Sequence, residues 1–175
     1  TYGYSIKQKA ADIMETSINS LREEFISKSI NKGKDTLSFG SFLIGPKQSA
    51  IQTTTGSIVS KQATLNPNFA AMITEMLMEL EIKQSNIVAI SYTGSFPGAN
   101  IAILAALEAL NVQALIISSC GASEYGATHE QMNWIDIENY LFINQIISNR
   151  SQLASIGGGH DLGTQLGTNG KKICE

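Results

Sequence analysis

Three stretches of the sequence combine glycine with serine or threonine, and a fourth combines three glycines with a histidine and an aspartate; these residue types can hold an anion or supply a nucleophile and its base. They are Thr53 to Ser57, Thr93 to Gly98, Ser118 to Ser123 and Gly157 to Asp161. Glycine lets the backbone approach a ligand closely, and hydroxyl groups and free backbone amides donate hydrogen bonds to carboxylates and phosphates. If these stretches meet in space, the sequence predicts a binding site for a negatively charged group.

The most distinctive of the four is Gly94-Ser95-Phe96-Pro97-Gly98, which comes just before a predicted helix. Serine is among the preferred N-cap residues, so Ser95 is expected to cap this helix. The free amides of the first helical turn could then bind a carboxylate or phosphate. A plain serine-capped turn is the commoner use of such a pattern, and anion binding is the alternative.

A wider set of residues completes the expected ligand site. Lys61 is the only cation between Lys47 and Lys83 and could neutralise an acidic ligand, although an isolated lysine is usually solvated. The predicted ligand-binding residues are Thr54, Thr55, Lys61, Thr93, Gly94, Ser95, Ser118, Ser119, Gly158 and Gly159.

Catalysis by a serine is a second interpretation of the same stretches. Ser95 or Ser119 could act as the nucleophile, with His160 as the base and Asp161 or Asp136 as the carboxylate of a Ser-His-Asp set. The nucleophile elbow G-x-S-x-G does not fit Ser95, whose glycines lie one residue before and three residues after it. A histidine after three glycines is more often an exposed loop residue, so the catalytic set stays a minority hypothesis.

Composition excludes several other functions. Twelve basic residues against fifteen acidic ones give a net charge of −3, and no basic run predicts nucleic-acid binding. Two histidines and two cysteines predict no metal site, and the absence of a P-loop or G-x-G-x-x-G motif predicts no nucleotide cofactor. Cys120 follows an apolar strand and is expected to be a small buried hydrophobe. The redox state of Cys120 and Cys174 is left open.

The elements that must position these residues alternate between strand and helix. Apolar periodicity and capping residues predict helices over residues 5–29, 67–80, 97–110 and 134–147, and strands over 39–44, 87–91, 114–118 and 153–156. Gly33 is expected to end the first helix, and the polar stretch 47–64 is expected to be a functional loop or to hold a hairpin. Short strands rich in Ile and Val that alternate with helices are typical of a parallel sheet covered on both faces.

We therefore expect residues 1–175 to form a single α/β domain with a mainly parallel sheet in a Rossmann-like, three-layer arrangement. In such sheets ligands bind beyond the carboxyl ends of the strands, and each glycine- and hydroxyl-rich stretch follows a predicted strand. The apolar stripe of the first helix, which includes Leu21 and Phe25, is expected either to pack on the sheet or to face a partner. A second copy of the chain is one such partner.

Several of these segments together resemble the poly-γ-glutamate system protein family. The likeness covers roughly residues 45 to 163 and includes TTTG from Thr53, LNPNFA from Leu65, SYTGSFPGANIAILAA from Ser91, IISSCGAS from Ile116, WIDIE from Trp134 and SIGGGHDLG from Ser155. The family pattern has an aliphatic residue where this chain has Cys120, which argues against a catalytic role for that thiol.

The resemblance implies an accessory protein of the machinery that makes and exports poly-γ-glutamate capsule. It implies a membrane-anchored parent protein, with the anchor outside this chain and this domain outside the cytoplasmic membrane. The absence of an initial Met is consistent with a fragment. Its expected partners are proteins of the synthesis and export complex and poly-γ-glutamate itself. The resemblance leaves three roles open: carboxylate binding, hydrolysis or transfer of γ-glutamyl amides by a serine nucleophile, and protein interaction alone.

Overall fold

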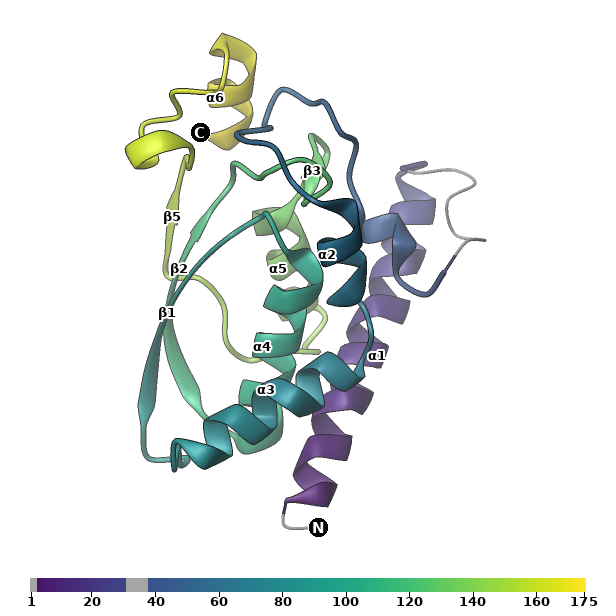
Figure 1. The fold of residues 1–175 in the computed structure, drawn as a ribbon, viewed down its shortest axis with the longest axis vertical. Coiled ribbons are helices and arrows are strands. Elements are labelled where there is room, and N and C mark those ends of the chain that lie inside the picture. Colours follow the sequence, from purple (N-terminus) through teal and green to yellow (C-terminus); the bar gives the residue numbers. More distant parts are fainter. Residues whose placement is uncertain (1–2, 31–37) are drawn as a thin grey trace.

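The computed structural model describes residues 3–30 and 38–175 (Figure 1). The helices are α1 (Tyr4–Ser27), α2 (Ile58–Ala63), α3 (Asn68–Glu79), α4 (Pro97–Leu110), α5 (Trp134–Ile143) and α6 (Thr168–Cys174). The strands are β1 (Ile87–Thr93), β2 (Gln113–Ser119), β3 (Thr128–His129), β4 (Met132–Asn133) and β5 (Leu153–Ser155). Within the described residues, two short 3₁₀ turns, η2 (Ser41–Leu43) and η3 (Gly159–Asp161), complete the elements. The expected helix end at Gly33 lies outside the described residues.

The main sheet has three parallel strands in the order β1-β2-β5. Ile87 is opposite Gln113, Ser91 is opposite Ile117, and Ile117 is in turn opposite Leu153. Strands β3 and β4 form a separate antiparallel ribbon. The mixed α/β architecture with a parallel sheet is thus confirmed.

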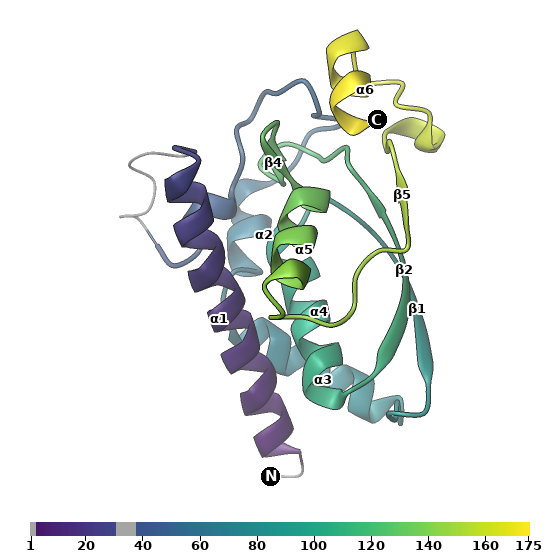
Figure 2. The ribbon, with the colours of Figure 1, turned by 180° about the vertical axis from the view of Figure 1, so that it is seen from behind.

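Helices cover only one face of this sheet within the described residues. In Figure 1 the three strands stand at one side with α1 to α5 all on the other, and Figure 2 shows the same arrangement from behind. The strands follow this asymmetry, because buried or half-buried residues alternate with exposed ones along both β1 and β2. The three-layer, Rossmann-like arrangement is therefore not confirmed.

Helix α4 lies at the centre of the helical layer. It is almost wholly apolar, and ten of its 14 residues are buried, which fits a helix packed on several sides. It lies against α1 and α3. Asn111, with φ of 54°, ends the helix in the left-handed conformation that asparagine tolerates.

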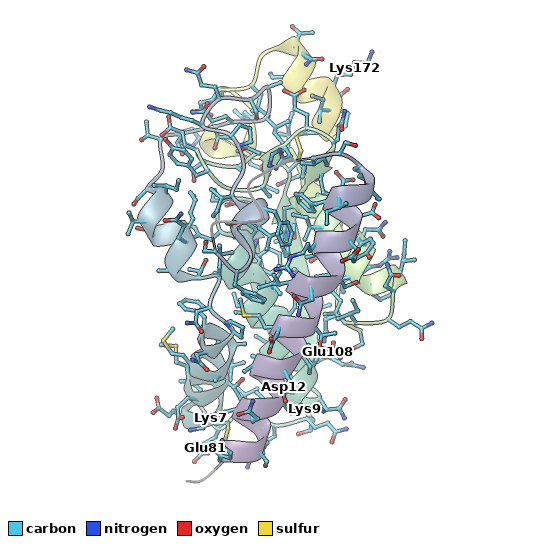
Figure 3. The ribbon with its side chains drawn as sticks, turned by 90° about the vertical axis from the view of Figure 1, so that its right-hand side faces the viewer. Lys7, Lys9, Asp12, Glu81, Glu108 and Lys172 are labelled. Carbon is cyan, nitrogen blue, oxygen red and sulfur yellow. A yellow bond between two sulfur atoms is a disulfide. The ribbon has the colours of Figure 1, made fainter. Side chains whose placement is uncertain are left out.

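The first helix forms as predicted, and its apolar stripe is used inside the molecule. Leu21 is fully buried and Phe25 nearly so, and α1 packs on α3, α4 and α5 rather than on the sheet. Figure 3 shows α1 running the length of this side of the molecule, with Lys9 and Asp12 among its exposed side chains. Lys7 of α1 also pairs with Glu75 of α3. This stripe is therefore not a free surface for a partner.

Other element predictions need correction. Residues 39–44 form no strand: the segment contains η2, and its apolar side chains pack on α1, with the Phe25 and Phe42 rings 4.9 Å apart. The stretch 47–64 holds helix α2, capped by Ser57, and no hairpin. Helix α3 begins at Asn68, one residue later than predicted, and Met76 on it is exposed because α1 and α4 cover its other sides. Helix α5 ends at Ile143, four residues earlier than predicted.

None of the helices in the described residues is both long enough and apolar enough to cross a membrane.

Candidate functional site

The carboxyl ends of the strands do gather several of the predicted stretches. Loop residues 51–54 run parallel to the segment after β2: the Thr53 amide donates to the Ala122 carbonyl (2.8 Å), and the Ala122 amide donates to the Ile51 carbonyl (3.1 Å). The Gly94 amide donates to the Ser119 carbonyl (3.2 Å). Loop 51–54, the turn after β1 and the turn after β2 therefore form one continuous hydrogen-bonded edge.

Ser95 lies in this edge, and it does not cap α4. The N-cap position is Phe96, which has no side-chain capping bond. The Ser95 hydroxyl instead accepts a hydrogen bond from the Ser123 amide (3.0 Å), and the Ser95 amide donates to the Thr93 hydroxyl (3.1 Å). The prediction of an N-cap was wrong because a segment distant in sequence competes for this hydroxyl.

The start of α4 is also closely packed. A Cβ atom on Gly98 would lie 2.6 Å from the Thr64 carbonyl oxygen and 2.7 Å from its hydroxyl oxygen. Only glycine lets the first turn of α4 approach Thr64, the C-cap residue of α2, this closely. The first turn of α4 therefore packs closely against Thr64.

Lys61 of α2 is the most unusual residue at the strand ends, because its side chain is almost completely buried. Its ammonium group donates to the Ser95 carbonyl and to the Ser123 hydroxyl (2.8 Å), and it lies 4.2 Å from the centre of the Phe96 ring. Burial lowers the pKa of Lys61 from its ordinary value. We call Lys61, Ser95, Phe96 and Ser123 the Lys61 cluster.

No carboxylate pairs with Lys61 in the part of the chain that the structure describes. The three N–H groups of the Lys61 ammonium are matched by a carbonyl, a hydroxyl and an aromatic ring. These contacts satisfy its hydrogen-bonding capacity but do not neutralise its charge. Glu124 follows Ser123 in the sequence, but its carboxylate accepts a hydrogen bond from the Gly56 amide (3.2 Å) and does not pair with Lys61. The predicted residues Thr54 and Thr55 are exposed on the loop that leads to Gly56.

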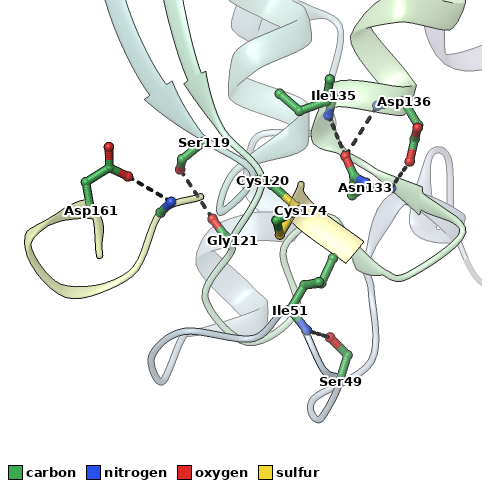
Figure 4. The surroundings of a disulfide bond; sticks show 11 residues. Ser49, Ile51, Ser119, Cys120, Gly121, Asn133, Ile135, Asp136, Asp161 and Cys174 are labelled. Carbon is green, nitrogen blue, oxygen red and sulfur yellow. Dashed lines mark hydrogen bonds between the residues drawn. A yellow bond between two sulfur atoms is a disulfide. The ribbon is translucent and has the colours of Figure 1, made fainter. Parts of the chain in front are cut away.

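The second half of the strand-end region surrounds Ser119. The Ser119 hydroxyl is directed to the Gly121 carbonyl (3.4 Å), and Gly157 lies directly against it. The Asp161 carboxylate accepts from the Gly157 amide (2.8 Å), which closes the loop after β5 (Figure 4). Asp161 therefore stabilises a turn in this structure.

No hydrogen bond in the described residues links the members of the expected catalytic set. His160 is exposed, and no hydrogen bond joins it to Ser95 or Ser119 within residues 38–175. Asp136 belongs to a capping box with Asn133 at the start of α5, as Figure 4 shows, and burial raises its pKa.

Three other predicted residues have different surroundings. Ser118 points to the helix-covered face, where its hydroxyl accepts from the Trp134 indole (3.3 Å). Gly158 and Gly159 lie in the loop after β5, and the Gly159 amide donates to the Gln165 side chain (2.7 Å). None of the three contacts Lys61 through a hydrogen bond in the described residues.

A disulfide between Cys120 and Cys174 ties α6 to the end of β2 (Figure 4). The two cysteines are 54 residues apart in sequence, with their Cα atoms 5.6 Å apart. Gly170 of α6 allows the same docking, because a Cβ atom there would lie 1.9 Å from the Ala50 carbonyl oxygen. Cys120 is buried as predicted, but as half of a disulfide rather than as a free thiol; the even number of cysteines was the only sequence signal.

Sequence reasoning also missed a buried polar network beneath the sheet. Glu138 of α5 accepts hydrogen bonds from the Tyr92 hydroxyl (2.6 Å), the Ser151 amide (2.9 Å) and the Ser151 hydroxyl (3.0 Å). The Ser151 hydroxyl in turn bonds to the Ser118 hydroxyl. Burial, together with the Glu138 carboxylate, raises the pKa of Tyr92 well above its ordinary value.

No group of three or more histidine, cysteine, aspartate or glutamate side chains that could hold a metal ion occurs among the described residues.

No protein-family model, curated protein or solved structure matches this chain. The likeness to poly-γ-glutamate system proteins therefore depends on the sequence motifs alone, and the function that it implies stays a prediction.

Proposed function

We propose that this domain is an accessory component of a poly-γ-glutamate capsule synthesis and export system, and that its Lys61 cluster attracts carboxylate groups of the polymer or of a partner protein. The sequence likeness supports the pathway. The convergence of the Thr53, Gly94 and Ser123 segments around a lysine supports the chemistry.

The observation that carries the ligand part is the charge of Lys61, which is buried and has no carboxylate partner among the described residues. A charge in surroundings of low polarity acts over a longer distance than one in water. The Lys61 donors are occupied, so a carboxylate would bind to nearby exposed hydroxyls, such as those of Thr54 and Thr55, and would be attracted by the ammonium group behind them.

The disulfide between Cys120 and Cys174 supports a location outside the cytoplasmic membrane. Structural disulfides persist in oxidising compartments and are rare in the cytosol. An envelope-facing domain held by a membrane anchor elsewhere in the parent protein is consistent with this chemistry. The described residues supply two layers, and the Rossmann-like, three-layer arrangement would need a second helical layer from outside them.

Calorimetric titration with γ-linked glutamate oligomers tests the ligand part. We expect binding with a Kd of about 1 mM or tighter that weakens as salt is raised, as for any contact dominated by charge. Lys61→Met should weaken binding about tenfold, and Lys83→Met, which removes an exposed lysine, should leave it unchanged. Absence of binding, or equal loss in both variants, would remove the Lys61 cluster as the site.

The capsule part needs a separate test in cells. Deletion of the gene should reduce the amount or chain length of the polymer, and the unmutated gene should restore it. Unchanged capsule after deletion would refute the pathway whatever the titration shows.

One observation favours a second candidate function, hydrolysis or transfer of γ-glutamyl amides. The Ser123 hydroxyl lies 2.8 Å from the Lys61 amine, whose pKa burial lowers, as in a serine–lysine pair. A neutral Lys61 would take the Ser123 proton while the hydroxyl oxygen attacks the amide carbon. The amine would then leave with a proton, and water would release the acyl group.

Release of nitroaniline from γ-glutamyl p-nitroanilide tests this candidate. The activity should disappear in Ser123→Ala and persist in Ser60→Ala, which removes an exposed hydroxyl of the same helix as Lys61. A rate no higher than that of the Ser123→Ala protein would eliminate the enzyme hypothesis.

A further inference from the structure

The face of the main sheet that points away from the helices is apolar and uncovered. Residues that share this face, which we call the outer face, are Ile87, Ala89, Ser91, Thr93, Gln113, Leu115, Ile117 and Leu153. Both ribbon views show no described element over it (Figures 1 and 2). Leu115 and Leu153 have 60% and 66% of their surface exposed, values expected for lysine rather than leucine.

An uncovered apolar face of a parallel sheet is unusual and indicates that another element or molecule covers it. Parallel sheets are found almost only with both faces covered, because their side chains are apolar on both sides. Contiguous apolar patches on a soluble surface mark sites of association. The outer face therefore points to a binding surface distinct from the Lys61 cluster.

The outer face carries no ionisable side chain on any of the three strands. An acidic polymer would gain no charge contact there, so poly-γ-glutamate is a poor occupant. A second copy of the same face meets no repulsion between like charges, which makes the surface electrostatically compatible with itself.

The shape of the outer face is also complementary to a second copy of itself. Large side chains on β2 and β5, namely Leu115, Ile117 and Leu153, form a ridge beside the small Ala89 and Ser91 of β1. Ile87, at the start of β1, is large and lies outside the hollow next to this ridge. A hollow of about 440 Å³ runs beside this ridge and is lined by both sets. A two-fold axis between two stacked sheets, parallel to the strands, would place the ridge of each copy over the small residues of the other.

We propose that a second copy of this chain docks on the outer face, so that two sheets stack about 10 Å apart with each ridge in the hollow of its partner. Two strands of seven residues and one of three, spaced about 4.8 Å apart with about 3.3 Å per residue, span only about 270 Å² per copy. A stable interface of standard size needs about 800 Å² per partner. The dimer is therefore weak and forms at high local concentration.

Sedimentation velocity on the whole chain tests the dimer. Between about 10 µM and about 1 mM we expect the sedimentation coefficient to rise from that of a monomer toward that of a dimer. Leu115→Asp places a charge on the ridge and should raise the dissociation constant about tenfold or more. Ile143→Asp is the matched control, because Ile143 is equally exposed, at 65%, on the helical side.

A second variant distinguishes specific stacking of the two sheets from non-specific association. Ala89→Phe fills the hollow, so it should weaken a dimer in which the ridge enters that hollow, whereas non-specific association would grow with the added apolar area. A chain that stays monomeric at about 1 mM, an unchanged Leu115→Asp protein or a strengthened Ala89→Phe protein would each overturn the proposal. A monomer would leave the outer face to a helix of another protein.

Discussion

The two faces of the main sheet come from the same strands and differ in almost every other respect. The covered face presents Ile116, Ser118 and Tyr92 to the helical layer, whereas the outer face presents Leu115 and Ile117 to solvent. The covered face even holds a buried carboxylate, Glu138 of α5. The outer face carries no charge at all.

This difference shows that the hydrogen-bond donors around a face of the sheet decide whether a charged side chain can be held there. Glu138 is tolerated because three donors surround its carboxylate, which meets the requirement for a buried polar group. No described element lies next to the outer face to supply hydrogen-bond donors. Its polar side chains, such as those of Ser91 and Thr93, are small and uncharged. A partner can therefore cover it without having to neutralise a charge.

The sharpest test of the contrast uses two neighbours in β2. Ile116 is 2% exposed and Leu115 is 60% exposed. Ile116→Ala should lower the free energy of unfolding by about 3 kcal/mol, because it leaves a cavity in a packed layer. Leu115→Ala should lower it by less than about 1 kcal/mol. Urea denaturation at a few micromolar protein, where the proposed dimer is dissociated, measures both.

Equal losses in the two alanine variants would mean that the outer face is already covered in the isolated chain. In that case the one-sided sheet, and with it the argument for a second copy, would be wrong.

Removal of the buried polar network around Glu138 should lower the free energy of unfolding by less than the Ile116→Ala change does. Glu138→Ala leaves the Tyr92 hydroxyl and the Ser151 donors without their acceptor, which should cost about 2 kcal/mol of unfolding free energy. Glu138→Gln keeps one acceptor oxygen and should cost less. Glu15→Ala, at an exposed position of α1, is the control and should change stability by less than about 0.5 kcal/mol. A Glu138→Ala protein as stable as this control would show that the network does not hold the covered face together.

The sequence predicted the elements better than it predicted their surroundings. β1, β2 and α4 have strong local signals, namely short Ile- and Val-rich runs and an apolar helix that begins at proline, so their positions were predicted closely. Leu115, Ile116 and Ile117 are chemically alike, and no local pattern distinguishes the exposed residues from the buried one. The bare outer face could therefore not be predicted.

The same limit applies at the strand ends. The meeting of the turns after β1 and β2 could be predicted, because loops after parallel strands gather at one edge. The Thr53 segment was expected to join them as the loop after a strand at 39–44, and it joins them although that strand does not form. The burial of Lys61 could not, because a lone lysine is normally solvated and only the fold places Ser95 and Phe96 around it. The disulfide of Cys120 likewise depends on the path of the chain between two cysteines that are 54 residues apart in sequence.

The smallest expected effect concerns the pKa of Tyr92, which burial and Glu138 raise above its ordinary value near 10. Above about pH 10 the unfolded chain loses this proton while the folded chain keeps it, so the stabilising contribution of Tyr92 falls as pH rises. The stability difference between the unmutated protein and Tyr92→Phe should therefore shrink by up to about 1.4 kcal/mol per pH unit above pH 10. Urea denaturation at pH 9, 10 and 11 measures it, with Tyr4→Phe, at an exposed tyrosine, as the control. Parallel curves for the unmutated protein and Tyr92→Phe would show that Tyr92 ionises as freely in the folded state as in the unfolded one. The covered face would then be as open to solvent as the outer face.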